Sequence, residues 1–185
     1  MRTAIVAAMQ EELAAVLALM PHDGKQVAAG RQFWVGELHG REVVVVADRF
    51  LQHDLDASPI FPRFEVPLYG TSTFGCDVAL TKRVAAAAAS ALPGVHLHRG
   101  LVVSGDRFVA TTAESRALQA ALPAALAVEM EGAAFAQVCH DCGVPFAAVR
   151  TVSDRADDMA HIDFATFIRD VASRHSAAIV RALLA

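Results

Sequence analysis

Apolar runs alternate along this chain with segments whose apolar positions recur at helical spacing. Residues Thr3 to Ala8 are small and partly β-branched, and "MQEELAAVLALM" then carries apolar residues behind an acidic first turn. We therefore expect a strand and then a helix. "RQFWVGELHGREVVVVAD" predicts two strands turned at His39-Gly40, the second inside a sheet because it is uniformly apolar.

The middle of the chain breaks this pattern. From Arg49 to Gly75 the sequence has prolines and no period, which predicts a long irregular segment. Alternation then resumes, with helices expected near Thr81–Leu92, "TAESRALQAAL", "EGAAFAQVCHDCG" and Phe164–Leu184, and strands at "HRGLVVSG", "LAVEM" and "PFAAVRTVSD". This order predicts an α/β sandwich built on a mostly parallel sheet.

Composition narrows the class of protein. With 185 residues, 55% of them hydrophobic and 19% charged, the chain suits one compact domain over residues 1–185. The net charge of -4, a pI near 6.0 and the lack of a Lys/Arg block argue against nucleic acid or anionic lipid as partners. Small neutral or weakly charged molecules remain as possible ligands.

The N-terminal sequence and the cysteines indicate a compartment. Met1 runs directly into "TAIVAAMQEEL" without the features of a signal peptide, and no apolar stretch is long enough to span a bilayer. The three cysteines, an odd number, do not resemble a disulfide framework. We expect a cytoplasmic protein with no membrane partner.

Three predicted strands end in polar residues, at "VVSGDRF", "AVEMEG" and "RTVSDRADD". Ligands of α/β folds gather at the carboxyl ends of strands, so Asp106, Glu131 and Asp154 converge if these ends lie together. Each acid also suits an ordinary helix N-cap or first turn, and both interpretations stay open. Glu129 is expected to be a structural acid.

Two further carboxylates, Glu11 and Glu12, open the first predicted helix. The plainer interpretation is a solvated first turn, which the helix dipole favours. Carboxylates in separate environments would also suit glycosidic cleavage, in which one assists the leaving group and the other directs water.

Metal and redox chemistry find little support. Cys139 and Cys142 lie toward a helix end, where the dipole raises a thiol pKa, and no second cysteine pair exists, so we expect buried thiols. His53, Asp54 and Asp56 lack a partner histidine at a recognised spacing, which favours a structural loop. No Walker, GxGxxG or GxSxG motif occurs.

Several motifs together carry a family resemblance. "AIVAAMQEEL", "LVVSGDRFV", "AVEMEGAAFAQVC", "VPFAAVRTVSDRADD" followed by "HIDF", and a weaker "HDLDAS" fall in order over most of the chain. They resemble the 5'-methylthioadenosine/S-adenosylhomocysteine nucleosidases of the purine nucleoside phosphorylase-like superfamily. The resemblance implies a three-layer α/β/α sandwich with a mixed, mostly parallel central sheet, and hydrolysis of the N-glycosidic bond of a 5'-substituted adenosine without cofactor or metal.

The resemblance also assigns catalytic roles. Asp154 is implied to protonate or hydrogen-bond adenine N7 with Ser153 orienting it, and Glu12 to hold the attacking water. These roles agree with the need for an acid whose pKa a partly desolvated pocket can raise. The implied substrate contacts are Glu131 to the ribose hydroxyls, Met130 on the sugar, Phe108 stacked on adenine, the Val109 backbone on its polar edge, and Met9 and Phe164 along the 5' group.

Such enzymes are similar in forming homodimers, in which a segment after the central strand reaches the neighbour's pocket. Asp56 to Phe61 is the matching segment here, and its apolar Ile60 and Phe61 suit a subunit contact.

The chain departs from the family between Val46 and Ala47. A segment of roughly forty to fifty residues, more than one βαβ-type unit, is absent there. In the family it carries a central strand, a helix and glycine-rich turns that contact the ribose and the nucleophile. Two interpretations stay open: a sequence that omits residues of the protein, and a real deletion, which predicts a destabilised fold or a dead site.

Three alternative functions follow from these observations. A purine nucleoside phosphorylase of the same fold needs a cationic phosphate site, whereas "MQEEL" places carboxylates near the nucleophile. The absent segment could hold phosphate ligands, so this alternative stays open beside a hydrolase of other substrate choice, such as futalosine. A catalytically impaired nucleoside-binding remnant is the third possibility if the gap is real.

Overall fold

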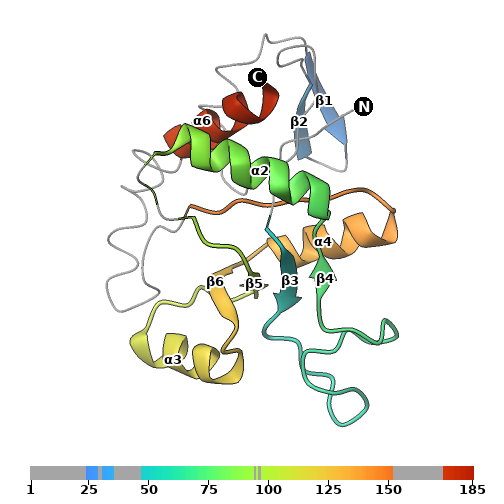
Figure 1. Ribbon diagram of the computed structural model, residues 1–185. Helices are drawn as coiled ribbons and strands as arrows, with labels where there is room; N and C mark the ends of the chain where they lie inside the picture. Colours follow the sequence, from blue (N-terminus) through green and yellow to red (C-terminus); the bar gives the residue numbers. More distant parts are fainter. Residues whose placement is uncertain (1–23, 29–30, 36–46, 94, 96, 152–172) are drawn as a thin grey trace.

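The fold is built around a four-stranded sheet (Figure 1). The structure, a computed structural model, describes residues 24–28, 31–35, 47–93, 95, 97–151 and 173–185. The strands of the sheet are β3 (Arg49–Gln52), β4 (Phe74–Gly75), β5 (Leu101–Ser104) and β6 (Ala125–Glu129), in the order β4-β3-β5-β6. A separate antiparallel pair consists of β1 (Gly24–Ala28) and β2 (Arg31–Val35).

The strand directions confirm the expected mixed, mostly parallel sheet. β3 and β5 run parallel, as do β5 and β6, whereas the short β4 is antiparallel to β3. Phe50 of β3 lies opposite Val102 of β5, and Val102 lies opposite Ala127 of β6. The carboxyl ends of β3, β5 and β6 therefore meet at one edge of the sheet.

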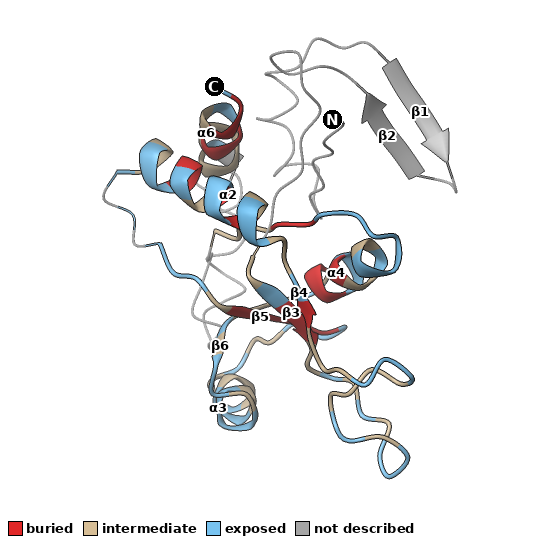
Figure 2. Ribbon diagram, turned by 45° about the vertical axis from the view of Figure 1, so that its right-hand side comes forward, coloured by how far each residue is buried: buried red, intermediate tan, exposed pale blue. Residues whose placement is uncertain are grey.

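Helices cover both faces of this sheet because its strands are apolar on both sides. On one face, the core that includes Phe50 and Val102 contains residues of α2 (Val78–Ala91), α4 (Gly132–Asp141) and α6 (Ser173–Leu184). On the other face, Leu51 and Val103 pack with Leu118 of α3 (Thr112–Ala121). Figure 2 shows α4 and α3 on opposite sides of the sheet. The layers are helix, sheet and helix, as predicted.

The helices begin where the sequence offers side-chain caps. The carboxylate of Asp77 accepts the Leu80 N–H at 2.7 Å at the start of α2. The hydroxyl of Thr111 accepts the Glu114 N–H at 3.2 Å and donates to the Glu114 carboxylate at 2.9 Å at the start of α3. These local bonds explain why the helical pattern located both elements to within a few residues.

Two expectations are corrected. The segment predicted to be irregular from Arg49 onward begins with β3, because Phe50 and Leu51 alternate between the two cores as only a strand allows. The irregular part spans 53–73. The strand expected at "PFAAVRTVSD" is absent from 145–151, where the Phe146 carbonyl instead accepts the Asp77 N–H at 2.7 Å and no strand of the described chain forms a ladder beside it.

The remaining expectations concern the N-terminal part of the chain and the last helix. β1 was not predicted by the hydrophobic pattern, whereas β2 coincides with the expected strand at "RQFWV". The expected first strand and helix, the strand "REVVVV" and the beginning of the last helix lie outside the described residues.

Gly132, at the first residue of α4, lets the helix approach the sheet closely. A Cβ there would lie 2.1 Å from Cε1 of Phe50, a ring that is fully buried and cannot move aside. We expect Gly132→Ala to lower the free energy of unfolding by about 1–3 kcal/mol, measured by urea denaturation. Gly75→Ala is the control, because nothing lies within 4 Å of its Cβ position. Equal stability of the two variants would contradict this packing.

Candidate functional site

The carboxyl ends of β5 and β6 are joined by hydrogen bonds that place the predicted substrate-binding segments beside each other. The Gly105 N–H donates to the Glu129 carbonyl at 3.1 Å, and the Ser104 hydroxyl donates to the Glu129 carboxylate. Ser104 Oγ also accepts the Ala133 N–H at 2.7 Å. The segments after β5 and β6 therefore leave the sheet from one small region.

Glu129 is the structural acid at this edge. Its carboxylate accepts the Gly132 N–H at 2.9 and 3.0 Å and the Glu131 N–H at 3.3 Å, and it pairs with the guanidinium of Arg150. Its side chain is only 11% exposed. A carboxylate this buried needs such partners, so Glu129 supports the first turn of α4, in agreement with its predicted structural role.

Glu131 uses its carboxylate differently. It occupies the N-cap position of α4, yet its side chain makes no capping hydrogen bond. Instead one carboxylate oxygen accepts from Arg150 Nη2 at 3.0 Å, and the side chain is 39% exposed. The simple N-cap interpretation of Glu131 is therefore wrong, because its carboxylate pairs with Arg150 instead, and the Ala133 N–H, one of the amides that a capping side chain would bind, donates to Ser104 Oγ.

The other described site residues lie on the same two segments. Met130 is exposed between Glu129 and Glu131, next to α4. Phe108 is 44% exposed in the segment after β5, and Val109 beside it is half-buried. The structure thus attaches the predicted base-binding and sugar-binding residues to adjacent strand ends. The remaining predicted site residues lie outside the described residues: Met9, Glu12, Ser153, Asp154 and Phe164.

Sequence reasoning missed two members of this arrangement, Arg150 and Ser104. Arg150 bonds both Glu129 and Glu131, and Ser104 is a buried hydroxyl that links β5 to β6 and α4. A signal for Arg150 was present, since a lone arginine directly follows the buried run "FAAV". A serine at the end of an apolar strand carries no comparable signal.

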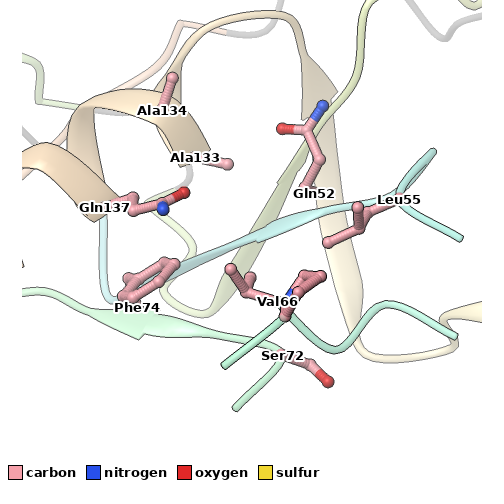
Figure 3. Close-up of a pocket in the computed structure, with 9 residues that line it drawn as sticks. Gln52, Leu55, Val66, Ser72, Phe74, Ala133, Ala134 and Gln137 are labelled. Atoms are coloured by element: carbon pink, nitrogen blue, oxygen red, sulfur yellow. The ribbon is translucent and has the colours of Figure 1, made fainter. Parts of the chain in front are cut away.

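A cavity of about 210 Å³ opens between the end of β3 and α4 (Figure 3). None of the residues predicted to bind substrate lines it. It is smaller than typical small-molecule sites, which begin near roughly 300 Å³. Its lining is Gln52, Leu55, Val66, Pro67, Ser72, Phe74, Ala133, Ala134 and Gln137.

The thiols and acids of the described chain do not form a redox or metal centre. Burial, with Asp48 nearby, raises the pKa of Cys76 to about 12, and burial raises the pKa of Cys139 above its ordinary value. Cys142 is exposed, which corrects the expectation that both cysteines of "CHDC" are buried. Within the described ranges, no group of three or more His, Cys, Asp or Glu side chains is arranged to hold a metal ion.

Residues 44–185 match the Phosphorylase superfamily. The chain belongs to this superfamily. A 5'-methylthioadenosine/S-adenosylhomocysteine nucleosidase of Shewanella denitrificans is 36% identical over 141 residues, which cover 76% of this chain and 60% of the relative. The crystal structure of an S-adenosylhomocysteine nucleosidase from Streptococcus pyogenes with 5-methylthiotubericidin superposes with a TM-score of 0.89 at 26% identity, covering 100% of this chain and 96% of that one. Within the superfamily the chain falls in the nucleosidase family, as the motifs implied.

A further relative bears on the central gap. The nucleosidase of Shewanella halifaxensis is 29% identical in an alignment of 229 positions that takes in 100% of this chain and 99% of the relative. Because this chain has 185 residues, the alignment is 44 positions longer than the chain. That difference agrees with the forty to fifty residues expected to be absent after Val46.

The same fold also serves another hydrolase. The structure of futalosine hydrolase from Helicobacter pylori has a TM-score of 0.85 at 24% identity, covering 98% of this chain and 96% of that one, which establishes similarity of fold alone. In the described part of this chain, none of the helices has the length and apolar character needed to cross a membrane.

Proposed function

We propose that this chain acts on a 5'-substituted adenosine, of the 5'-methylthioadenosine or S-adenosylhomocysteine type, and hydrolyses its N-glycosidic bond to release adenine. The observation that carries the proposal is the carboxylate of Glu131 at the carboxyl edge of the sheet. Its Oε2 accepts a hydrogen bond from Arg150 Nη2 at 3.0 Å, and it does not cap the helix that follows. Membership of the nucleosidase family and the motifs that surround this residue support the same activity.

The proposed sugar contacts follow from the chemistry of Glu131. An ionised carboxylate has only acceptor atoms, so it suits the two donor hydroxyls of a ribose. The hydrogen bond to the Arg150 guanidinium limits the rotamers of the Glu131 side chain, which lowers the cost of ordering it on binding. Met130, exposed on the preceding residue, would supply an apolar contact to the sugar.

The base would bind at the segment after β5. Phe108 presents a partly exposed ring, and an aromatic face stacks favourably on a planar purine. The backbone of the adjacent Val109 would read the polar edge of adenine. Met9 and Phe164 would line the site of the 5' group, a role that rests on the family resemblance.

The proposed reaction breaks the bond between ribose C1' and adenine N9. Asp154, oriented by Ser153, would donate a proton or hydrogen bond to N7, so that the base leaves without carrying full negative charge. Positive charge develops on the sugar as the bond lengthens. Glu12 would direct a water oxygen to C1' and accept one of its protons. The products are adenine and the free 5'-substituted ribose.

The catalytic roles are tested by substitution. We expect Asp154→Asn and Glu12→Gln each to lower kcat by about 10²–10⁴-fold, because each loses one general acid or base, with the thermal unfolding midpoint preserved. Adenine release from 5'-methylthioadenosine is the measurement, and Asp157→Asn is the control acid from the same "SDRADD" stretch. Parent-like turnover by either variant would place that chemistry on another residue. Turnover that requires phosphate would establish the phosphorylase instead, and cleavage of futalosine alone would change the substrate.

We also propose a homodimer in which Asp56 to Phe61 lies near the partner subunit's pocket. Two side chains of the irregular segment 53–73 support this: Ile60 is 82% exposed and Leu68 is 92% exposed. Large apolar side chains left this exposed on one loop favour a protein contact. Phe135 and Val138 add apolar surface on the outer face of α4.

The dimer is tested with Ile60→Asp. A charge at the centre of an apolar contact is expected to shift the protein from a mass near twice 19.6 kDa to the monomer mass in light scattering after gel filtration. Val78→Asp is the control, since Val78 is also exposed but lies at the start of α2, where an acid is compatible with the helix dipole. A parent chain that is monomeric at micromolar concentration would refute the dimer.

We propose a nucleoside-binding remnant with impaired turnover as a second candidate, because a real loss of the central segment would produce the difference of 44 positions from the Shewanella halifaxensis relative. If the segment is truly lost, the strand and glycine-rich turns that it carries in the family are lost too. An intact mass spectrum near 19.6 kDa, together with adenine binding but no release, is the result expected of a remnant. A mass several kilodaltons larger, or adenine release at an ordinary enzymatic rate, would exclude it.

A further inference from the structure

We infer that Asp54 is a positioning residue, which holds the segment 105–109 in the conformation that presents Phe108 and Val109. Asp54 lies in the turn that follows β3 and is not part of the proposed contacts to substrate. Its link to base binding rests on the proposed function, whereas its link to the segment 105–109 rests on the structure of the sheet edge alone.

The contact is a short hydrogen bond between segments far apart in sequence. Asp54 Oδ2 accepts the backbone N–H of Asp106 at 2.6 Å. The other carboxylate oxygen, Oδ1, accepts Gln52 Nε2 at 2.7 Å, which fixes the rotation of the carboxylate. Because Asp106 lies two residues before Phe108, the bond restrains the backbone that carries the proposed base-stacking ring.

His53 adds two contacts beside that bond. Its N–H donates to the Ser104 carbonyl at 2.7 Å, which continues the pairing of β3 with β5 by one residue. Its imidazole lies against Gly105, where a Cβ would fall 2.3 Å from Nε2 of His53. Only glycine permits this approach. Residues 53 and 54 together therefore contact residues 104–106 through two hydrogen bonds and the packing of the imidazole on Gly105.

The electrostatics of Asp54 strengthen the bond. Partial burial by itself raises the pKa of Asp54, but the hydrogen bonds from the Asp106 N–H and the Gln52 amide outweigh it and hold the pKa below its ordinary value. The group is therefore an ionised acceptor at neutral pH. Hydrogen bonds to ionised acceptors are shorter and stronger than those between neutral groups.

The far side of the segment has a less direct anchor. Arg107 Nη2 donates to the carboxylate of Glu114 in the first turn of α3 at 2.6 Å, but the Arg107 side chain is 77% exposed, and exposed ion pairs contribute little. A partly exposed ring such as Phe108 is also restrained less by packing than a buried one. Asp54 is exposed as well, but its bond acts directly on the backbone N–H of Asp106, whereas Arg107 is held only through its side chain, so the Asp54 bond is the more direct restraint on the backbone of the segment.

The experiment compares Asp54→Ala and Asp54→Asn with the parent chain and with Asp48→Ala. Asp48 is the matched control: it precedes the same strand at the opposite end, and its side chain pairs with Arg99 at the surface. Hydrogen–deuterium exchange of residues 105–111 is measured for each protein. Adenine is then titrated by calorimetry, and kcat and KM are determined separately.

Loss of the charged acceptor is expected to speed exchange in 105–111 by roughly tenfold to a hundredfold in Asp54→Ala and to raise the dissociation constant of adenine about tenfold. KM should rise with it while kcat changes little. Asp54→Asn keeps an acceptor oxygen without the charge and should lie between parent and Asp54→Ala. It also serves as the test if Asp54→Ala fails to fold, and Asp48→Ala should match the parent.

Two results would overturn the inference: exchange in 105–111 that is the same in the parent and both Asp54 variants, or faster exchange with unchanged adenine affinity. A loss of kcat per folded molecule with KM unchanged would also contradict a positioning role for Asp54. If the parent chain binds no adenine, the proposed function fails together with the base-binding part of this inference. The exchange data then decide separately whether Asp54 holds the segment.

Discussion

The buried carboxylate of Glu129 is the constraint on which the described site depends. It receives the backbone amides of Glu131 and Gly132, the Ser104 hydroxyl and the Arg150 guanidinium, so three segments distant in sequence meet at one group. A partly buried charge of this kind is tolerated only when its lone pairs are occupied. These hydrogen bonds hold the partners of Glu129 in place, and through them they fix the start of α4 relative to the sheet.

This arrangement gives two neighbouring acids different environments. Glu129 and Glu131 lie two residues apart and both contact Arg150, yet the first is almost enclosed and the second is 39% exposed. Glu129 binds the Gly132 N–H and Ser104 binds the Ala133 N–H, so the carboxylate of Glu131 takes no part in capping the helix. A neighbouring acid that supports the backbone thus leaves the next one available for a ligand. Asp54 likewise supports a backbone, that of the segment after β5, because its carboxylate accepts the Asp106 N–H.

The described strands pair regularly at the edge of the sheet that carries the site. β3, β5 and β6 are paired in register and form cores on both faces, so this half of the sheet is internally consistent. Residues 145–151 are rich in β-branched and apolar side chains, and Phe146 and Ala147 are buried, but they have no ladder in the described chain.

The sequence by itself determined the alternation of strands and helices and the two segments that carry Phe108 and Glu131. These features follow from local rules, periodicity and short-range hydrogen bonds, which the order of residues expresses directly. Only the tertiary structure decided that Arg49 begins a strand and that Arg150 pairs with both glutamates. It also decided that Asp54 reaches Asp106. Those contacts join residues far apart along the chain, and no local pattern encodes which distant groups the pairing of strands will bring within hydrogen-bonding distance.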